Sequence, residues 1–251
     1  MIGESFIPHS FHPQLAQVFA RFEHPVKIVT RYDQSDLGKD LQKFSSELAA
    51  LTDKIAVTLE ETADIPGMEL FFHDGRATGI IYHALPNGQE FNSFIAAIYN
   101  TAGPGKVIDA EAEKKAKTIT SKKAVKIIVT LSCHNCPVVV QAMQRMASLN
   151  DNISVEIFDY AHFTDLKDKY NLKGVPCCII NEEDERKFIY GKKECQKFME
   201  NEKVVKFVRE KGVNALPLTL LDGEIVKEGK YPTNDELAKY LEVPNMAELM
   251  K

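Results

Sequence analysis

A repeated order of secondary-structure signals constrains the fold of this 251-residue chain more than any other feature. In the first half, apolar periodicity, β-branched runs and turn residues predict a helix, a strand, a helix, three further strands and a closing helix. These elements are expected at residues 13–22, 26–30, 37–51, 55–59, 70–73, 78–83 and 89–99. Because a helical crossover favours parallel strands and the Asp74-Gly75 hairpin gives antiparallel ones, this order predicts a mixed sheet with flanking helices.

The second half repeats this plan after a lysine-rich connector at residues 111–123, which we expect to be exposed. A strand, a helix, a strand, a helix and a strand are expected at residues 125–131, from 133, at 153–158, at 163–170 and from 174 onward. The predicted fold class is therefore α/β, with tandem thioredoxin-like folds, mixed central sheets and flanking helices.

The remaining residues predict a shorter run with a helix at 194–211, a hairpin formed by 216–221 and 224–228, and a last helix at 233–241. The second unit has no closing helix of its own, so we expect the helix at 194–211 to take that place. The sequence therefore predicts a chain of three parts. They are a cysteine-free thioredoxin-like unit at 1–118, a redox-active thioredoxin- or glutaredoxin-like unit at 119–193, and a half-thioredoxin tail at 194–251 packed on the second unit.

Composition excludes several classes of function. The net charge is −5 and the sequence has no long run of basic residues, so we expect no binding to nucleic acid or to a membrane surface. No apolar stretch approaches the roughly 18 residues of a membrane span, and residues 1–10 lack a signal-peptide pattern. We therefore expect a cytoplasmic protein.

The five cysteines are unevenly placed, and none precedes Cys133. That distribution does not resemble a disulfide framework, whereas a Cys-x-x-Cys pair in a β-α-β context indicates redox chemistry. Half of a zinc site is the alternative interpretation. It is disfavoured because no second Cys-x-x-Cys or His pair stands at ligand spacing, and we expect no metal.

Cys133 and Cys136 are expected to have different roles. Thiol exchange needs a thiolate, and the start of a helix that follows a strand lowers the pKa of a cysteine placed there. Cys133 is therefore the predicted attacking thiol. Cys136, one helical turn further, is the predicted resolving thiol, and His134 between them is expected to add cationic character and to contact substrate.

Val175 and Pro176 precede the last strand of the second unit. In a thioredoxin plan this proline is cis and lies beside the cysteine pair, where the preceding backbone is free to pair with an extended substrate. We therefore assign both residues to substrate binding. The alternative is a proline that starts an edge strand and has no such role.

Cys177 and Cys178 allow two interpretations. Successive strand residues point to opposite faces, so at most one of them can face Cys133, and both can be small buried core residues. The other interpretation is a soft-metal or arsenite site completed by a third thiol such as Cys195, because thiolates suit soft ions.

The segment from Leu131 to Ala142, with Gly88-Gln89-Glu90-Phe91 and Gly174-Val175-Pro176, closely resembles the N-terminal domain of the flavoprotein component of bacterial alkyl hydroperoxide reductase over residues 8–181. The resemblance implies two fused thioredoxin folds that pass electrons from a flavin domain to a peroxiredoxin. It also implies that Glu90 approaches the thiols and accepts their protons, although a solvated glutamate at a helix start is an equally good interpretation.

This chain lacks a Gly-x-Gly-x-x-Gly motif between a strand and a helix, so we expect no cofactor and an external reductase or oxidant. Its substrates are expected to be protein disulfides or dithiols. Whether the enzyme reduces or forms disulfides is not determined by the residues.

The tail resembles the C-terminal half of the arsenic metallochaperone family, particularly at Leu216-Pro217-Leu218-Thr219 and Tyr231-Pro232-Thr233-Asn234. That family carries trivalent arsenic on an N-terminal cysteine motif, and no matching motif stands before this tail. The favoured function is thus a dithiol–disulfide oxidoreductase. An arsenite or soft-metal binding chaperone or sensor is the alternative.

Overall fold

The computed structural model describes residues 5–172, 174–181, 186–189, 202–211, 218–221, 224–230, 232, 236 and 239–240. Its strands are β1 (Val26–Tyr32), β2 (Ile55–Glu61), β3 (Gly67–Phe71), β4 (Ala77–His83), β5 (Lys123–Val129), β6 (Ile153–Asp159), β7 (Cys177–Ile180), β8 (Arg186–Ile189), β9 (Leu218–Leu221) and β10 (Glu224–Glu228). Its helices are α1 (His12–Ala20), α2 (Asp36–Ala49), α3 (Phe91–Ala102), α4 (Ala110–Lys117), α5 (Cys136–Leu149), α6 (Leu166–Lys169) and α8 (Glu202–Lys211), with 3-10 turns η1 (His9–Phe11) and η2 (Gly88–Glu90).

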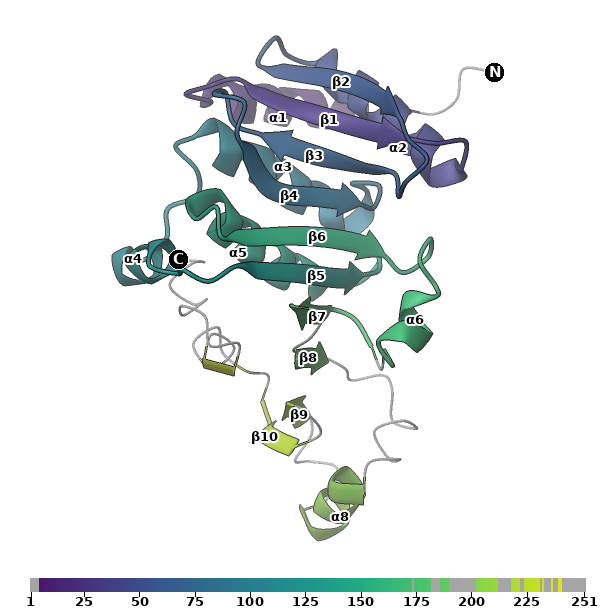
Figure 1. The fold of residues 1–251 in the computed structure, drawn as a ribbon, viewed down its shortest axis with the longest axis vertical. Coiled ribbons are helices and arrows are strands. Elements are labelled where there is room, and N and C mark those ends of the chain that lie inside the picture. Colours follow the sequence, from purple (N-terminus) through teal and green to yellow (C-terminus); the bar gives the residue numbers. More distant parts are fainter. Residues whose placement is uncertain are drawn as a thin grey trace.

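The described strands form one sheet in the order β10-β9-β8-β7-β5-β6-β4-β3-β1-β2 (Figure 1). In the first unit β1 pairs parallel with β2 and antiparallel with β3, which pairs antiparallel with β4. In the second unit β5, β6, β7 and β8 repeat the same pattern. The expected mixed α/β architecture with flanking helices is confirmed, and the duplicated pairing explains why the sequence signals repeat.

The two units share the sheet through β4 and β6, which pair in parallel from Ile80 with Val155 to His83 with Phe158. Strand β4 is the last strand of the first unit, so a paired seam replaces what would otherwise be two exposed sheet edges. One hydrophobic core runs across this seam and includes Tyr82 and Phe94 from the first unit and Ile157 from the second.

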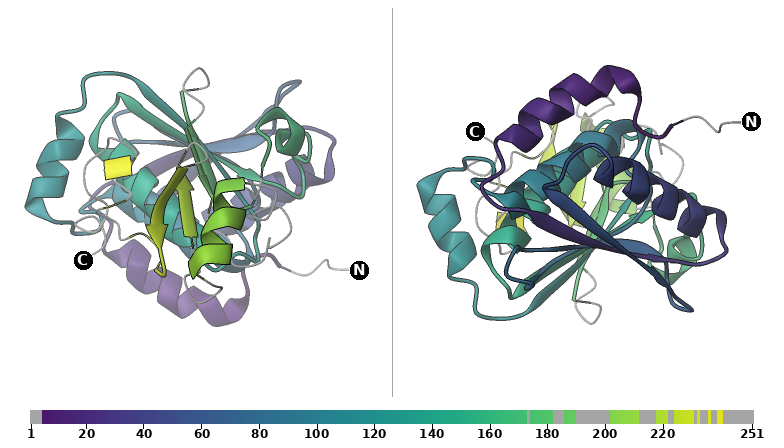
Figure 2. Two further views of the ribbon diagram at one scale, coloured as in Figure 1. Left: turned by 90° about the horizontal axis from the view of Figure 1, so that it is seen from below. Right: turned by 90° about the horizontal axis from the view of Figure 1, so that it is seen from above.

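Helices α3 and α5 lie side by side on one face of this sheet (Figures 1 and 2). Helix α3 is buried along nearly its whole length, because it packs against the sheet, α5 and other parts of the core. A smaller core lies on the opposite face of the second unit, and it includes Ile128, Phe158 and Tyr170. The start of α5, at the second cysteine of the Cys-x-x-Cys motif, is thereby held beside the start of α3.

Three sequence-based expectations need correction. The connector at 111–123 is not exposed throughout, because Asp109 caps the helix α4 and turns the buried Ala112 and Ala116 inward. Alanines four residues apart share one helix face, so a lysine-rich segment can still pack. The helix expected from Cys133 begins at Cys136, and the helix expected at 163–170 is limited to α6.

The described part of the tail contains α8, β9 and β10. Strand β9 pairs with β8 through Phe188 and Leu221, and β10 pairs antiparallel with β9, so the tail extends the sheet. The first part of the helix expected at 194–211 lies outside the described residues, as does most of the helix expected at 233–241.

Candidate active site

Cys133 lies in the turn that joins β5 to α5. Its backbone N–H donates to the carbonyl of Thr130 at 2.9 Å, and α5 begins three residues later at Cys136. Cys133 is half-buried and Cys136 is fully buried, and both are free thiols. The strand-turn-helix connection therefore leaves one thiol accessible to a substrate and keeps its partner beneath it.

The two thiols have opposite acidities. Donation from the Cys136 thiol lowers the pKa of Cys133 to about 6, against the opposing effect of burial, and the N–H groups of Asn135 and Cys136 and the charge of His134 add to the lowering. The same hydrogen bond, burial and the charge of Cys133 raise the pKa of Cys136 well above its usual range. Cys133 is therefore the thiolate at neutral pH. The neighbouring thiol is the largest cause, ahead of the helix start on which the sequence-based expectation relied.

The segment at Val175 and Pro176 lies against the attacking thiol. The peptide bond between them is cis, as expected, and the Sγ atom of Cys133 lies 3.8 Å from the carbonyl oxygen of Val175. Val175 is half-buried, whereas Pro176 is buried. His134 is exposed beside Cys133. The structure thus brings together the thiols and the residues that the sequence assigned to the substrate-facing surface.

Glu90 reaches the same site from the first unit. Its side chain is 0% exposed, and neither carboxyl oxygen has a hydrogen-bond partner among the described residues. Burial raises the pKa of Glu90 to about 7, the Ser93 hydroxyl opposes this rise, and the negative charge of Cys133 adds to it. The charge of Glu90 also contributes to the raised pKa of Cys136. A solvated glutamate at a helix start is therefore the wrong interpretation, because the second unit covers the start of α3.

The turn η2 holds Glu90 in this position. The N–H of Gln89 donates to the carbonyl of Leu131 at 2.9 Å, in the turn that leads to Cys133. Gly88 has a φ of +54°, and a Cβ atom there would lie 2.5 Å from the same carbonyl oxygen. Only glycine permits this approach of the two backbones. Gly88 was named in the sequence only as part of the resemblance and was given no structural role, although a glycine two residues before the acidic residue was a usable signal.

A buried polar pair next to Glu90 was also missed. The Nε2 atom of Gln144 on α5 donates to the hydroxyl of Tyr82 on β4, and both residues are 0% exposed. Burial raises the pKa of Tyr82, and so does the charge of Glu90, while Gln144 opposes the rise. Gln144 lies two helical turns after Cys136 on the inward face of α5. A lone amide among the apolar residues of that face could have signalled the pair.

Cys177 and Cys178 do not face each other. Cys177 belongs to the smaller core and Cys178 to the main core, on opposite faces of β7, and both are buried. Burial raises the pKa of Cys178, with a further contribution from Cys177. The described residues contain no group of three His, Cys, Asp or Glu side chains able to hold a metal ion, and Cys195 lies outside them. The interpretation of the pair as small buried core residues fits this arrangement.

Two family models match neighbouring segments of the chain. Residues 123–188 match the family model "Thioredoxin domain", and residues 190–251 match "Arsenical resistance operon protein ArsD". The alkyl hydroperoxide reductase protein AhpF of Pseudomonas aeruginosa is 32% identical over 68% of this chain and 33% of its own length. A Bacillus subtilis protein named NADH dehydrogenase is 29% identical over the same shares.

A solved domain gives the decisive comparison. The crystal structure of the NTD_N/C domain of alkyl hydroperoxide reductase AhpF from Enterococcus faecalis superposes with a TM-score of 0.69 at 30% identity, over 77% of this chain and 98% of that domain. The chain belongs to the AhpF N-terminal domain family. Membership confirms the expected thioredoxin-like fold. The chain spans a third of the length of the curated AhpF relatives that it matches.

No helix in the described part of the chain has the length and apolar character needed to cross a membrane.

Proposed function

We propose that this chain exchanges disulfides with protein partners through Cys133 and Cys136. The observation that carries the proposal is the pairing of an accessible thiol of pKa about 6 with a buried thiol that stays protonated. An attacking thiol is most effective when its pKa is near the ambient pH, because it is then both ionised and nucleophilic. Cys133 meets that condition in the described structure.

The reaction proceeds in two balanced steps. The thiolate of Cys133 attacks one sulfur of a substrate disulfide, so a Cys133–substrate bond forms and the other substrate sulfur leaves as a thiolate. Cys136 then loses its proton and attacks the sulfur of Cys133. The substrate departs fully reduced and a Cys133–Cys136 disulfide remains. Two electrons pass from the protein to the substrate, and the reverse sequence forms a disulfide in a substrate.

Glu90 is the proposed acceptor of the Cys136 proton. A carboxyl group with a pKa of about 7 is partly ionised at neutral pH and can both take and return a proton. Its electrostatic influence on Cys136 supports a position near that thiol. The interaction of Glu90 with the Ser93 hydroxyl favours the ionised carboxylate, which is the form that receives a proton.

Val175, Pro176 and His134 are the proposed substrate-binding residues, of which Val175 and His134 are accessible and Pro176 is buried. The carbonyl of Val175 lies against Cys133, so an extended substrate segment that pairs with this backbone would bring its disulfide to the attacking sulfur. His134 is exposed beside the same thiol and would meet the substrate side chains next to the disulfide. Both positions are on the accessible side of the site.

For the electron route, we propose a flavoprotein reductase as the donor and a peroxiredoxin as a substrate, with the cytoplasm as the compartment. The support is the family membership, since the AhpF relative of Pseudomonas aeruginosa carries the matched segment as a third of its length. The proposed thiolate chemistry requires a partner that supplies or removes two electrons in each cycle.

Measuring reduction of insulin or of a model peptide disulfide, with dithiothreitol as the donor, tests the proposal. The parent protein should accelerate reduction, Cys133→Ser should be inactive, and Cys136→Ser should accumulate a mixed disulfide at Cys133 that mass spectrometry detects. Cys178→Ser, a buried thiol outside the pair, is the matched control and should keep the activity. Equal activity of the parent and the Cys133→Ser variant would refute the proposal.

Arsenite binding is a second candidate function, which the ArsD match over residues 190–251 favours. The described residues give it no preformed three-thiol site, because Cys177 and Cys178 lie on opposite faces of β7. Titrating the reduced protein with arsenite distinguishes the candidates. Stoichiometric binding that is lost in Cys177→Ser and Cys178→Ser would support a carrier, whereas binding that requires only Cys133 and Cys136 would reflect capture by the reactive pair.

A further inference from the structure

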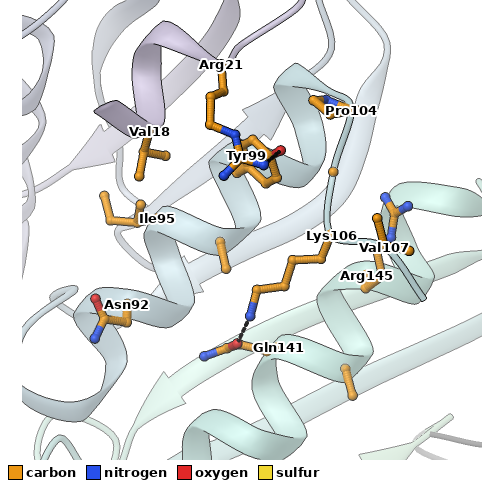
Figure 3. Close-up of a pocket in the computed structure, with 13 residues that line it drawn as sticks. Val18, Arg21, Asn92, Ile95, Tyr99, Pro104, Lys106, Val107, Gln141 and Arg145 are labelled. Atoms are coloured by element: carbon orange, nitrogen blue, oxygen red, sulfur yellow. Dashed lines mark hydrogen bonds between the residues drawn. The ribbon is translucent and has the colours of Figure 1, made fainter. Parts of the chain in front are cut away.

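A cavity of about 600 Å³ lies between the two units. Figure 3 shows the side chains that line it. It is bounded by α1, α3, α5 and the loop at 104–107, and neither Cys133 nor Cys136 lines it. Apolar side chains form part of its wall, including Val18 and Ile95. Three cationic side chains also line it, and no aspartate or glutamate does among the described residues. The cavity therefore combines an apolar wall with uncompensated positive charge.

Two of the cations, Arg21 and Lys106, are exposed and bond only to neutral groups in the described structure. The Nη2 atom of Arg21 donates to the hydroxyl of Tyr99 at 2.9 Å, and its guanidinium lies 5.1 Å from the centre of the Tyr99 ring. The Nζ atom of Lys106 donates to the Oε1 atom of Gln141 at 2.7 Å, across the cavity (Figure 3). These neutral partners orient both cations at the cavity without neutralising them.

The third cation, Arg145, is buried. Its side chain is 9% exposed, and its Nε atom has no hydrogen-bond partner among the described residues. Nη1 makes a 3.4 Å hydrogen bond to the Ser148 hydroxyl. The loop comes so close that a Cβ atom at Gly105 would lie 2.4 Å from Nη1. A buried guanidinium normally has an anionic partner, because removing an unpaired charge from water is costly.

No acidic side chain supplies that partner in the described structure. Burial lowers the pKa of Arg145, and the charges of Glu113 and Tyr99 oppose this only in part. Glu113 is itself hydrogen-bonded to Lys117 on α4. The influence of Tyr99 on Arg145, together with the hydrogen bond from Arg21 to Tyr99, supports the grouping of both arginines around one space.

We propose that this cavity binds a small organic anion, with a phosphate or dicarboxylate group facing Arg21, Lys106 and Arg145 and an apolar body along α3 and α5. Guanidinium and ammonium groups are the usual protein ligands of both anionic groups. The volume falls in the range of about 300–1,000 Å³ that is usual for small-molecule sites, and such sites commonly lie between structural units. The site is independent of the proposed exchange reaction, because neither thiol contributes to it.

Calorimetric titration of the full chain at low ionic strength tests the inference with phenyl phosphate, phthalate and inorganic phosphate. At least one of the two organic anions should bind with one-to-one stoichiometry and at least about tenfold more tightly than inorganic phosphate, because only it reaches the apolar wall. Tighter binding of phenyl phosphate would identify a phosphate as the preferred anionic group, and tighter binding of phthalate would identify a dicarboxylate. Cys133→Ser should bind equally well.

Charge-removing variants locate the binding. Lys106→Gln and Arg21→Gln lie on exposed side chains, so they should retain the fold and each weaken binding by about tenfold, the usual effect of losing one charge-assisted hydrogen bond. Lys39→Gln, an exposed lysine on α2 away from the cavity, should change nothing. No saturable binding of either organic anion, or equal affinity in the parent, Lys106→Gln and Arg21→Gln, would overturn the inference.

Discussion

Replacing Glu90 by glutamine should stabilise the folded protein at high pH and slow the exchange reaction. The carboxyl group ionises near its ordinary value of 4.5 when exposed, and burial raises its pKa to about 7 in the folded protein. The folded state therefore holds a proton that the unfolded chain has lost, and the parent loses stability as the pH rises from 4.5 through 7. This shift corresponds to about 3 kcal/mol above pH 7.

Urea unfolding of the reduced parent and of Glu90→Gln, at pH 4 and at pH 8, measures this effect. At pH 4 both side chains are neutral and similar in shape, so the free energies of unfolding should be close. At pH 8 the variant should be more stable by up to about 3 kcal/mol. Glu61→Gln, the same chemical change at an exposed position of β2, is the control and should show almost no difference at either pH.

The exchange assay completes this prediction. Glutamine cannot accept the proton of Cys136, so Glu90→Gln should resolve mixed disulfides about a hundredfold more slowly, within the usual effect of general acid–base catalysis. A stability difference that is the same at pH 4 and pH 8 would refute the burial effect. Resolution at the parent rate in a folded Glu90→Gln protein would refute the proton-acceptor role and leave the burial effect standing.

The same structure predicts the behaviour of three further variants or sites. Gly88→Ala should lose at least about 1 kcal/mol of stability and much of the exchange activity, because its Cβ meets the Leu131 carbonyl, whereas Gly75→Ala, which has a φ of +86° and open space around it, should keep the activity; urea unfolding and insulin reduction measure both. Cys178 should resist alkylation in the folded protein and react only after unfolding, as peptide mapping would show. Deleting residues 194–251, the proposed tail, should leave insoluble or molten protein, and a truncated protein that unfolds cooperatively with full activity would contradict this prediction.

Much of the fold could be predicted because its signals are local. The β-branched run before Cys133, the hairpin turn at Asp74-Gly75 and the helix periodicities of the first unit depend on neighbouring residues, and the structure contains these elements. The seam between β4 and β6 could not be predicted in the same way. Its parallel pairs, such as Ile80 with Val155, join residues far apart in sequence. No tight turn connects parallel strands, so no local sequence signal indicates this pairing.

The candidate site was predictable on the side of the second unit. Cys133, Cys136 and Pro176 belong to a recognisable spacing, so their meeting followed from the order of the strands. The residues that the first unit contributes to the site were harder to predict from the sequence. Glu90 was assigned only through resemblance. The burial of its side chain depends on the packing of η2 against Leu131. Tyr82 and Gln144 were missed because each looks like an ordinary element residue until α5 packs over β4.

The pH dependence of iodoacetamide alkylation at Cys133 tests the central claim most directly. The reduced protein would be labelled briefly between pH 4 and pH 9, and the label at each cysteine would be counted by peptide mapping. We expect Cys133 to react first, with a midpoint near pH 6, so that about 90% of it is thiolate at pH 7. A midpoint near 9.0, the ordinary cysteine value, or earlier labelling of Cys136 would contradict the assignment of the attacking thiol.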